Sequence, residues 1–224
     1  LQDPPADVTT FNILLDACRR AGDAARAPVP HGAQQRQRLL LAEAHHVEAA
    51  RRGVGDDRSL MVDAGCPWDA SPALTRAQLL APFNPFWLEE PLHRGDYVGM
   101  RALREHARCR IAGGEVTREL HEFAQILRDD CLDVYQPDVV FVGGMKHLID
   151  LGLQVFEKDL WFTPHTWGNG LGVIVNAHLV AAVAGRRGQK PVWLEFAHDP
   201  PEFTETPRDV LLAEPLTPRG GVLE

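Results

Sequence analysis

The chain has 224 residues, of which 45% are hydrophobic and 24% charged, the composition of an ordinary globular protein large enough for one substantial core. Its net charge of −8, from 23 basic and 31 acidic residues, gives no reason to expect nucleic acid or an anionic membrane as a partner. No run is long and apolar enough to span a bilayer, and the four cysteines are scattered without a metal-binding spacing, so we expect a cytoplasmic protein with free thiols.

The first part of the chain differs from the rest. Residues 1–44 contain arginine, glutamine and proline without a strand pattern, and we treat them as an atypical, irregular N-terminal segment. Residues 39–55, LLLAEAHHVEAARRGVG, predict a helix that leads into a strand at Leu60. From residue 45 to residue 224 we expect one domain.

Short apolar runs recur along that domain. In chain order they are LMVDAG (60–65), FWLEEP (86–91), CRIAGGE (109–115), LDVYQPD (132–138), LWFTPH (160–165) and PVWLEF (191–196). Between them lie segments with apolar residues at helical spacing, such as Tyr97, Met100 and Leu103. Strands that alternate with helices at this rate predict repeated βα units on a parallel sheet, either doubly wound or closed.

Each predicted strand ends in an ionisable residue. In chain order these are Asp63, Glu89, Glu115, Asp138, His165 and Glu195. In an open sheet only the strands beside a switch point share a site, whereas in a closed barrel the C-terminal ends of all strands surround one pocket. Six such residues, each about one βα unit from the next, therefore predict an α/β barrel of the TIM type.

Asp63, Glu89 and Glu115 are three carboxylates on successive predicted strands. Acidic residues are common near strand ends, so one alone would mean little, but three at matched spacing indicate a site. Like charges crowded into one pocket repel each other, and a divalent cation removes that cost. Oxygen-only ligands favour Mg²⁺ or Mn²⁺ over zinc. Neighbouring strand residues face opposite sides, so the spacing favours Glu89 as the ligand and gives Glu90 a structural role.

Asp138 and His165 end neighbouring predicted strands. A carboxylate beside an imidazole fixes its tautomer and raises its basicity, which makes a competent general base. A lone histidine is more often a core residue, but TPHTWGNG (163–170) places His165 at a strand end before a glycine-containing loop. Glu195, at the end of VWLEF, indicates nothing in isolation.

The combined pattern resembles the enolase superfamily, specifically the barrel domain of the mandelate racemase subgroup. The motifs that carry the resemblance occur in the family's order: MVDAG, WLEEPL, GGE, QPDV followed by GGM, TPHTWGNG and WLEF. The resemblance implies a (β/α)7β barrel in which the three carboxylates bind Mg²⁺. It also implies Asp138 and His165 as the general acid/base pair, and Glu195 as a hydrogen-bond donor or charge partner of the bound substrate.

The resemblance further implies the chemistry. Mg²⁺ bound to a substrate carboxylate would stabilise the enediolate left when His165 removes the α-proton. Departure of a β-hydroxyl then gives a 2-keto-3-deoxy acid, whereas return of the proton to the other face gives an epimer. We expect dehydration of an acid sugar, because Asp138 in place of a lysine resembles the racemase and dehydratase branch. A racemase or epimerase of a 2-hydroxy acid is the alternative.

The sequence departs from the family pattern before Asp63. The family has an N-terminal capping domain over the pocket and a Lys-x-Lys strand that binds the carboxylate and supplies a second base. The chain has too little sequence before Asp63 for that domain and no lysine before Lys146, so we expect a partial barrel without the cap. It is then either an enzyme with a truncated or damaged start, or a non-catalytic barrel that only binds metal or a partner. We also expect a homo-oligomer, because a barrel without its first strands exposes apolar surface.

Overall fold

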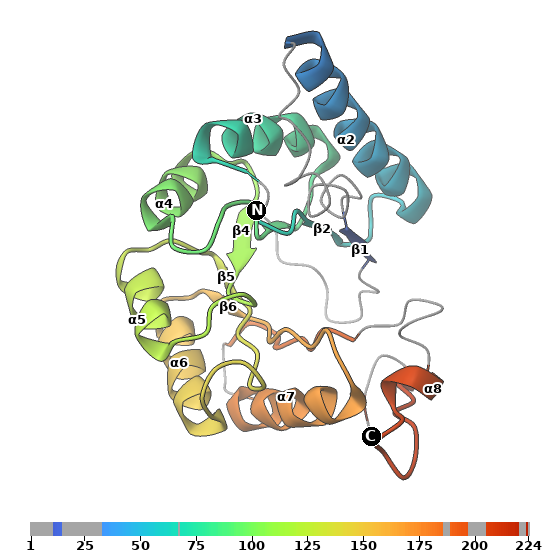
Figure 1. Ribbon diagram of the computed structural model, residues 1–224, viewed down its shortest axis with the longest axis vertical. Helices are drawn as coiled ribbons and strands as arrows, with labels where there is room; N and C mark the ends of the chain where they lie inside the picture. The colour runs from blue at the N-terminus through green and yellow to red at the C-terminus, as the bar shows by residue number, and fades with distance from the viewer. Residues whose placement is uncertain are drawn as a thin grey trace. The chain divides into compact units, whose positions relative to one another are not determined.

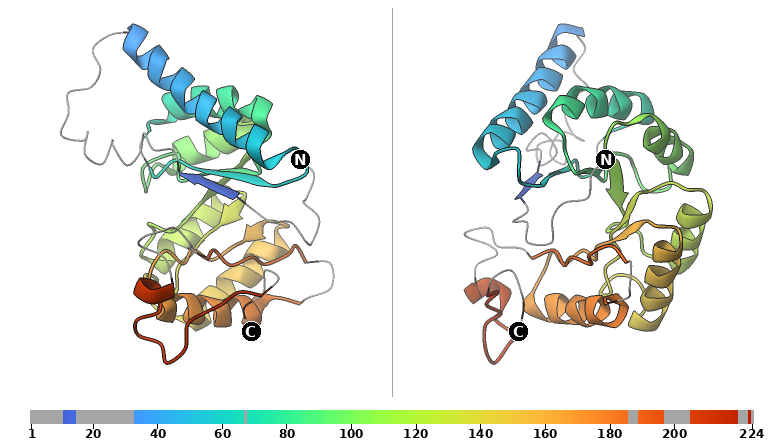
Figure 2. Two further views of the ribbon diagram at one scale, coloured as in Figure 1. Left: turned by 90° about the vertical axis from the view of Figure 1, so that its right-hand side faces the viewer. Right: turned by 180° about the vertical axis from the view of Figure 1, so that it is seen from behind.

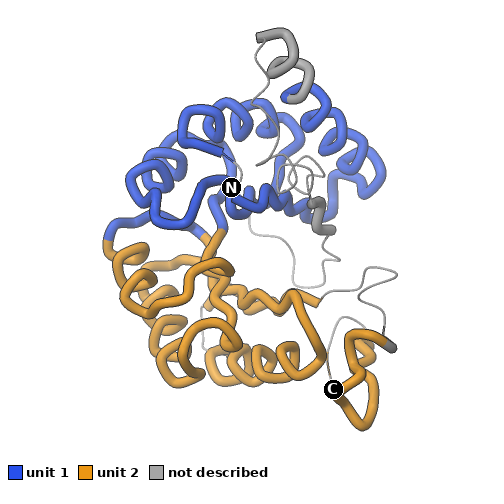
Figure 3. Tube along the Cα trace, viewed as in Figure 1, with its two compact units in different colours: residues 1–112, 129–133 blue, residues 113–128, 134–224 orange. Residues whose placement is uncertain are grey.

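The computed structural model describes residues 11–14, 33–66, 68–185, 189–196, 205–219 and 223, with side chains from residue 40 onward except those of residues 205 and 206. The chain divides into two compact units, shown in different colours in Figure 3. Unit 1 comprises residues 1–112 and 129–133, and unit 2 comprises residues 113–128 and 134–224. No helix among the described residues has both the length and the apolar character needed to cross a membrane.

Unit 1 is built on parallel strands that follow one another in chain order. They are β1 (Phe11–Leu14), β2 (Leu60–Asp63), β3 (Trp87–Glu89) and β4 (Arg110–Gly113), whose last residue opens unit 2. The helices are α2 (Ala33–Val54), α3 (Ala70–Leu80) and α4 (Tyr97–His106), with the 3-10 turn η1 (Ala81–Phe83) after α3. Helix α3 contacts both α2 and α4, and the three helices can be followed from two further directions in Figure 2.

The strands of unit 1 form where the sequence has its continuous apolar runs. Leu60, Met61 and Val62 of β2 are buried, as are Trp87 and Leu88 of β3. Strands that are apolar on both faces are typical of parallel sheets covered by helices. The predicted strands at Leu60 and Trp87 are therefore confirmed.

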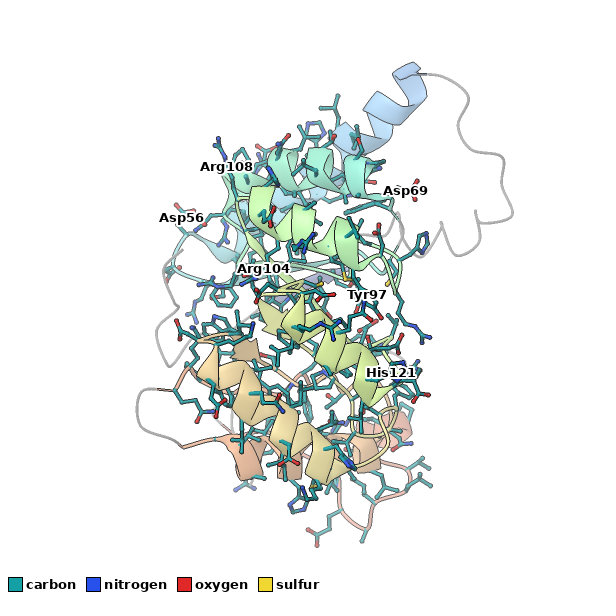
Figure 4. The ribbon with its side chains drawn as sticks, turned by 90° about the vertical axis from the view of Figure 1, so that its left-hand side faces the viewer. Asp56, Asp69, Tyr97, Arg104, Arg108 and His121 are labelled. Atoms are coloured by element: carbon teal, nitrogen blue, oxygen red, sulfur yellow. The ribbon has the colours of Figure 1, made fainter. Side chains whose placement is uncertain are left out.

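Helix α4 buries the apolar residues that the sequence pattern places on one face. Its buried face holds Met100 and Leu103 of the predicted stripe. Asp96 caps its first turn by accepting a hydrogen bond from Gly99 N at 2.9 Å. Arg104, labelled in Figure 4, donates from Nε to Asp133 Oδ1 at 2.7 Å and so ties residues 129–133 to unit 1.

Unit 2 repeats the alternation of strand and helix. In chain order it contains α5 (Leu120–Arg128), β5 (Val134–Tyr135), α6 (Met145–Glu157), β6 (Trp161–Phe162), α7 (Gly170–Val183) and α8 (Glu205–Arg208), which Figure 1 labels. Strands β5 and β6 are parallel, and α6 contacts both α5 and α7. The alternation predicts helices between the apolar runs, and α5 and α6 confirm this for the segments after residues 115 and 138.

The pairing of β5 with β6 continues beyond the two assigned strands. Thr163 N donates to Tyr135 O at 2.9 Å, and His165 N donates to Pro137 O at 3.2 Å. Both segments are therefore held side by side up to the residues that follow the strands. This extension brings Asp138 and His165 to the same level.

Two features differ from the prediction. Residues 191–196 carry no strand assignment, so the predicted strand there is wrong: an apolar run alone does not provide a hydrogen-bonded neighbour. Conversely, the sequence reasoning missed β1, which lies in a segment treated as irregular and pairs with β2 in register from Phe11 with Leu60 to Leu14 with Asp63. The domain boundary at residue 45 stays a prediction.

Candidate active site

Three carboxylates surround one imidazole in unit 2. His165 Nδ1 lies 3.0 Å from Asp138 Oδ2, and His165 Nε2 lies 3.2 Å from Glu115 Oε2 and 3.8 Å from Glu195 Oε2. The imidazole is buried, with 7% of its residue surface exposed. Four of the six residues at predicted strand ends thus lie within one cluster.

Asp138 is fixed by three hydrogen bonds to its side chain. Its Oδ2 accepts from His165 Nδ1, while its Oδ1 accepts from Asn176 Nδ2 and from Val140 N, both at 2.9 Å. Burial alone would raise the pKa of Asp138, but these donors outweigh it and hold the pKa below its ordinary value. Asp138 is therefore a carboxylate that keeps its charge and its orientation.

The pKa of His165 moves in the opposite direction. Burial of the imidazole tends to lower the pKa, but the hydrogen bond to Asp138 and the charges of Glu195 and Glu115 raise it above its ordinary value. The Nδ1–H bond to Asp138 leaves Nε2 as the nitrogen that can exchange a proton with another molecule. A base made stronger in this way suits a weakly acidic substrate proton.

An aromatic ring and a cation lie next to this cluster. The ring of Phe141 is stacked with the imidazole of His165, with 6.3 Å between centroids and 29° between planes. The guanidinium carbon of Arg118 lies 4.0 Å from the centroid of the Phe141 ring, and its Nη1 donates to Glu115 O at 2.7 Å. Arg118 thus adds a positive charge to a neighbourhood dominated by carboxylates.

Glu195 is held by the residue that follows His165. Its Oε2 accepts from Thr166 N at 2.9 Å, and its carbonyl oxygen accepts from the Thr166 hydroxyl. The segment 191–196 is therefore attached to the site by side-chain contacts. The Glu195 side chain remains 17% exposed, so it is not fully covered by the protein.

The remaining predicted site residues, Asp63 and Glu89, lie in unit 1. They are direct partners in the β2–β3 register. Asp63 Oδ1 accepts from Gly65 N at 2.9 Å, and Glu89 Oε2 accepts from the indole Nε1 of Trp87 at 2.9 Å. Glu89 is buried, with 4% exposure. A buried carboxylate is costly unless hydrogen-bond donors or a cation stabilise its charge.

Glu90 faces a different partner from Glu89. Its carboxylate accepts from the thiol of Cys66 at 3.0 Å, and its backbone has a φ of 41°, in the left-handed region. Cys66 has a φ of 62° as well, and its N–H donates to Glu90 O. This paired strain joins the two chain segments that follow β2 and β3, a structural role such as the sequence suggested for Glu90.

The donor chemistry of Asp63, Glu89 and Glu115 fits a hard divalent cation, because all three offer only carboxylate oxygens. Among the residues that the structure describes, no three His, Cys, Asp or Glu side chains form a group that could hold a metal ion. The three-ligand metal site therefore stays a prediction from the sequence.

Asn176 is the site residue that sequence reasoning missed. It lies on α7 with no exposed surface, and besides Asp138 it bonds the backbone through Val139 N to its Oδ1 at 3.1 Å. The available signal was a single amide in the apolar helix GLGVIVNAHLVAAV, since a buried polar side chain requires a partner. Its partner lies 38 residues earlier in the chain.

Parallel strands that alternate with helices, with an Asp–His pair after two neighbouring strands, define an α/β domain whose strand ends carry a candidate site. The sequence matches the family described as "Enolase C-terminal domain-like" over residues 34–224. The chain belongs to this family, as a C-terminal barrel domain of the mandelate racemase/muconate lactonizing enzyme group in the enolase superfamily. The predicted family and the α/β barrel-type fold are confirmed.

Similar proteins act on acid sugars and their derivatives. The chain is 37% identical to 3,6-anhydro-alpha-L-galactonate cycloisomerase of Streptomyces coelicolor over 56% of its length and 35% of that protein. It is 27% identical to D-galactarolactone cycloisomerase of Agrobacterium fabrum over 79% of its length and 47% of that protein. The chain thus spans between a third and a half of the length of these relatives.

A similar solved structure contains a metal and a sugar acid. It is the L-talarate dehydratase of Polaromonas sp. JS666, complexed with Mg and L-glucarate, at 29% identity and a TM-score of 0.69. The match covers 82% of this chain and 46% of that one. Related proteins of the family therefore bind Mg²⁺ and carboxylic acids of the sugar series.

Proposed function

We propose that the protein abstracts the proton α to a carboxylate of an acid sugar and eliminates a β-hydroxyl, which yields a 2-keto-3-deoxy acid. The observation that carries this proposal is the buried Asp138–His165 pair, in which one imidazole nitrogen is tied down and the other faces carboxylates and the ring of Phe141. Similar proteins of the family include acid-sugar dehydratases and cycloisomerases.

His165 would serve as base and then as acid. In the first step its Nε2 takes the α-proton, while the fixed charge of Asp138 stabilises the imidazolium that results. In the second step the same proton can pass to the departing hydroxyl, which leaves as water. A single base on one face of the substrate is sufficient for this elimination.

Asp63, Glu89 and Glu115 would hold Mg²⁺ or Mn²⁺, and we propose them as its three protein ligands. When bound, the ion supplies Lewis-acid stabilisation of the charge on the substrate carboxylate. Titration calorimetry with Mg²⁺ tests the assignment: binding at millimolar concentration should be lost in Glu89→Gln. Wild-type protein that fails to bind Mg²⁺ would contradict it.

Glu195 would act as a hydrogen-bond donor or charge partner of the substrate. Its position supports this role, because its carboxylate lies 3.8 Å from His165 Nε2 and is not fully covered. Substitution by glutamine keeps the shape and removes the charge, so Glu195→Gln should lower the turnover of a bound acid and leave the fold intact.

Incubation with a panel of aldonic and aldaric acids tests the reaction. The expected result is Mg²⁺-dependent formation of a 2-keto-3-deoxy acid from at least one acid, measured with a keto-acid reagent and identified by mass spectrometry. An epimer in place of the keto acid would point to the racemase alternative. Metal binding without any product would favour a barrel that only binds metal or a partner.

A further inference from the structure

A second pair of polar side chains precedes the Asp138–His165 pair. Asp138 and His165 are 27 residues apart and hydrogen-bonded to each other. Gln136 and Thr163 have the same separation two residues earlier, and the bond from Thr163 N to Tyr135 O at 2.9 Å continues the strand pairing there. Side chains two positions apart in extended chain face the same side, so Gln136 and Thr163 lie beneath the Asp138–His165 pair.

Both side chains of this lower pair are buried and incompletely bonded. Gln136 and Thr163 are each 4% exposed. Among the described residues, Gln136 Oε1 and Thr163 Oγ1 are buried side-chain oxygens without a hydrogen-bond partner. A buried polar atom without a partner loses its bonds to water and destabilises the fold, so native structures rarely contain two of them side by side.

The position beside Gln136 on the neighbouring segment is a glycine, Gly113. Gln136 N donates to Gly113 O at 2.9 Å, so Gly113 lies beside Gln136 and precedes Glu115 by the same two residues. A glycine contributes no side chain to this layer. The layer beneath the site therefore places two unmatched oxygens beside a position that has no side chain.

We propose that this layer binds one buried water molecule, held between Gln136 Oε1 and Thr163 Oγ1. A water molecule can donate one hydrogen to each oxygen, and two to four polar partners are usual for an internal water. It serves equally well if the amide of Gln136 is rotated, because water also accepts hydrogen bonds. The water joins the two segments that carry Asp138 and His165, and it does so whatever reaction the site performs.

Substitution by apolar residues of similar shape tests the proposal, because the proposal predicts whether the folded state becomes less or more stable. A bridged hydroxyl stabilises the fold, so Thr163→Val should lower the folding equilibrium constant by about fivefold, the effect of one net hydrogen bond. Gln136→Met should have a similar effect. The double variant should be little worse than either single one, because the same water is lost in all three. Thr117→Val, at an equally buried threonine outside this layer, is the control.

Urea unfolding followed by tryptophan fluorescence measures these values, and a crystal structure locates the water directly. We expect density for one water within about 3.2 Å of both oxygens in the wild type and none in Thr163→Val. A Thr163→Val variant more stable than the wild type would overturn the proposal, since it would show that the hydroxyl had no partner to lose. A direct bond between Gln136 and Thr163 in the crystal would overturn it as well.

Discussion

Replacement of Asn176 by leucine gives a direct measure of how strongly the fold holds Asp138, the carboxylate of the proposed acid/base pair. Leucine has nearly the same branched shape as asparagine but no polar atoms. The change removes the bond from Asn176 Nδ2 to Asp138 Oδ1 at 2.9 Å and the bond from Val139 N to Asn176 Oδ1 at 3.1 Å. Asn176 itself has no exposed surface, so leucine at this position would cover the Asp138 oxygen without offering it a hydrogen bond.

The expected loss follows from those two bonds. A hydrogen bond to a charged group contributes about 1.5–3 kcal/mol, and a buried N–H without a partner costs about 1–3 kcal/mol. We therefore expect Asn176→Leu to lower the free energy of unfolding by about 3 kcal/mol. The pKa of Asp138 should rise at the same time, because Asn176 is one of the donors that lower it.

Urea unfolding at neutral pH measures the loss, and the same helix provides a control. Asn169 caps α7 by accepting from Gly172 N at 3.2 Å, and Asn169→Ala should cost only about 1 kcal/mol. If Asn176→Leu costs no more than Asn169→Ala, the buried asparagine does not hold Asp138 and the described role is refuted.

Three further predictions concern reactivity, pH and backbone geometry. Burial raises the pKa of Cys109 to about 12 and that of Cys131 to about 11, so iodoacetamide at pH about 8 should label these thiols only after unfolding, whereas the half-buried Cys66 should react in the native protein. Peptide mapping checks this, and fast native labelling of Cys109 would contradict it. The hydrogen bond from a buried guanidinium holds the pKa of Asp209 below its ordinary value, so its stabilisation is present above about pH 4 and lost as the pH falls further. The unfolding free energy of Asp209→Asn should therefore fall less steeply below that pH, and an unchanged slope would argue against the effect. Gly114 has a φ of +125°, and an added Cβ would lie 2.9 Å from a buried ring of α5, so Gly114→Ala should cost about 2 kcal/mol or more in urea unfolding, and an unchanged midpoint would refute the strain.

The fold could be predicted where buried elements show a regular pattern of apolar residues in the sequence. The apolar runs at Leu60 and Trp87 mark strands covered on both faces, and the stripe of Met100 and Leu103 marks the buried face of a helix. The strand expected at residues 191–196 shows the limit, because this apolar run is neither assigned as a strand nor buried in the described structure. Strand β1 was missed because four residues outside a regular alternation give too short a pattern.

Part of the site could also be predicted from the sequence. Parallel strands bring their ends to one edge, so the spacing of Asp138 and His165 was enough to expect their contact. Asn176 approaches Asp138 from α7, and nothing in the spacing of the sequence indicates which helix residue meets which strand end. Glu90 likewise has a positive φ of 41° where its carbonyl oxygen accepts from Cys66 N, a conformation that its residue type does not predict.

His165 is the proposed base that removes the α-proton, and deuterium exchange tests that step apart from product formation. Each acid sugar is incubated with the protein and Mg²⁺ in D₂O, and the C2–H signal is followed by ¹H NMR. We predict loss of that signal for at least one acid with the wild type, and its retention with His165→Asn or without Mg²⁺. Exchange that persists in His165→Asn, or no exchange of any acid by a wild type that binds Mg²⁺, would contradict the proposed chemistry.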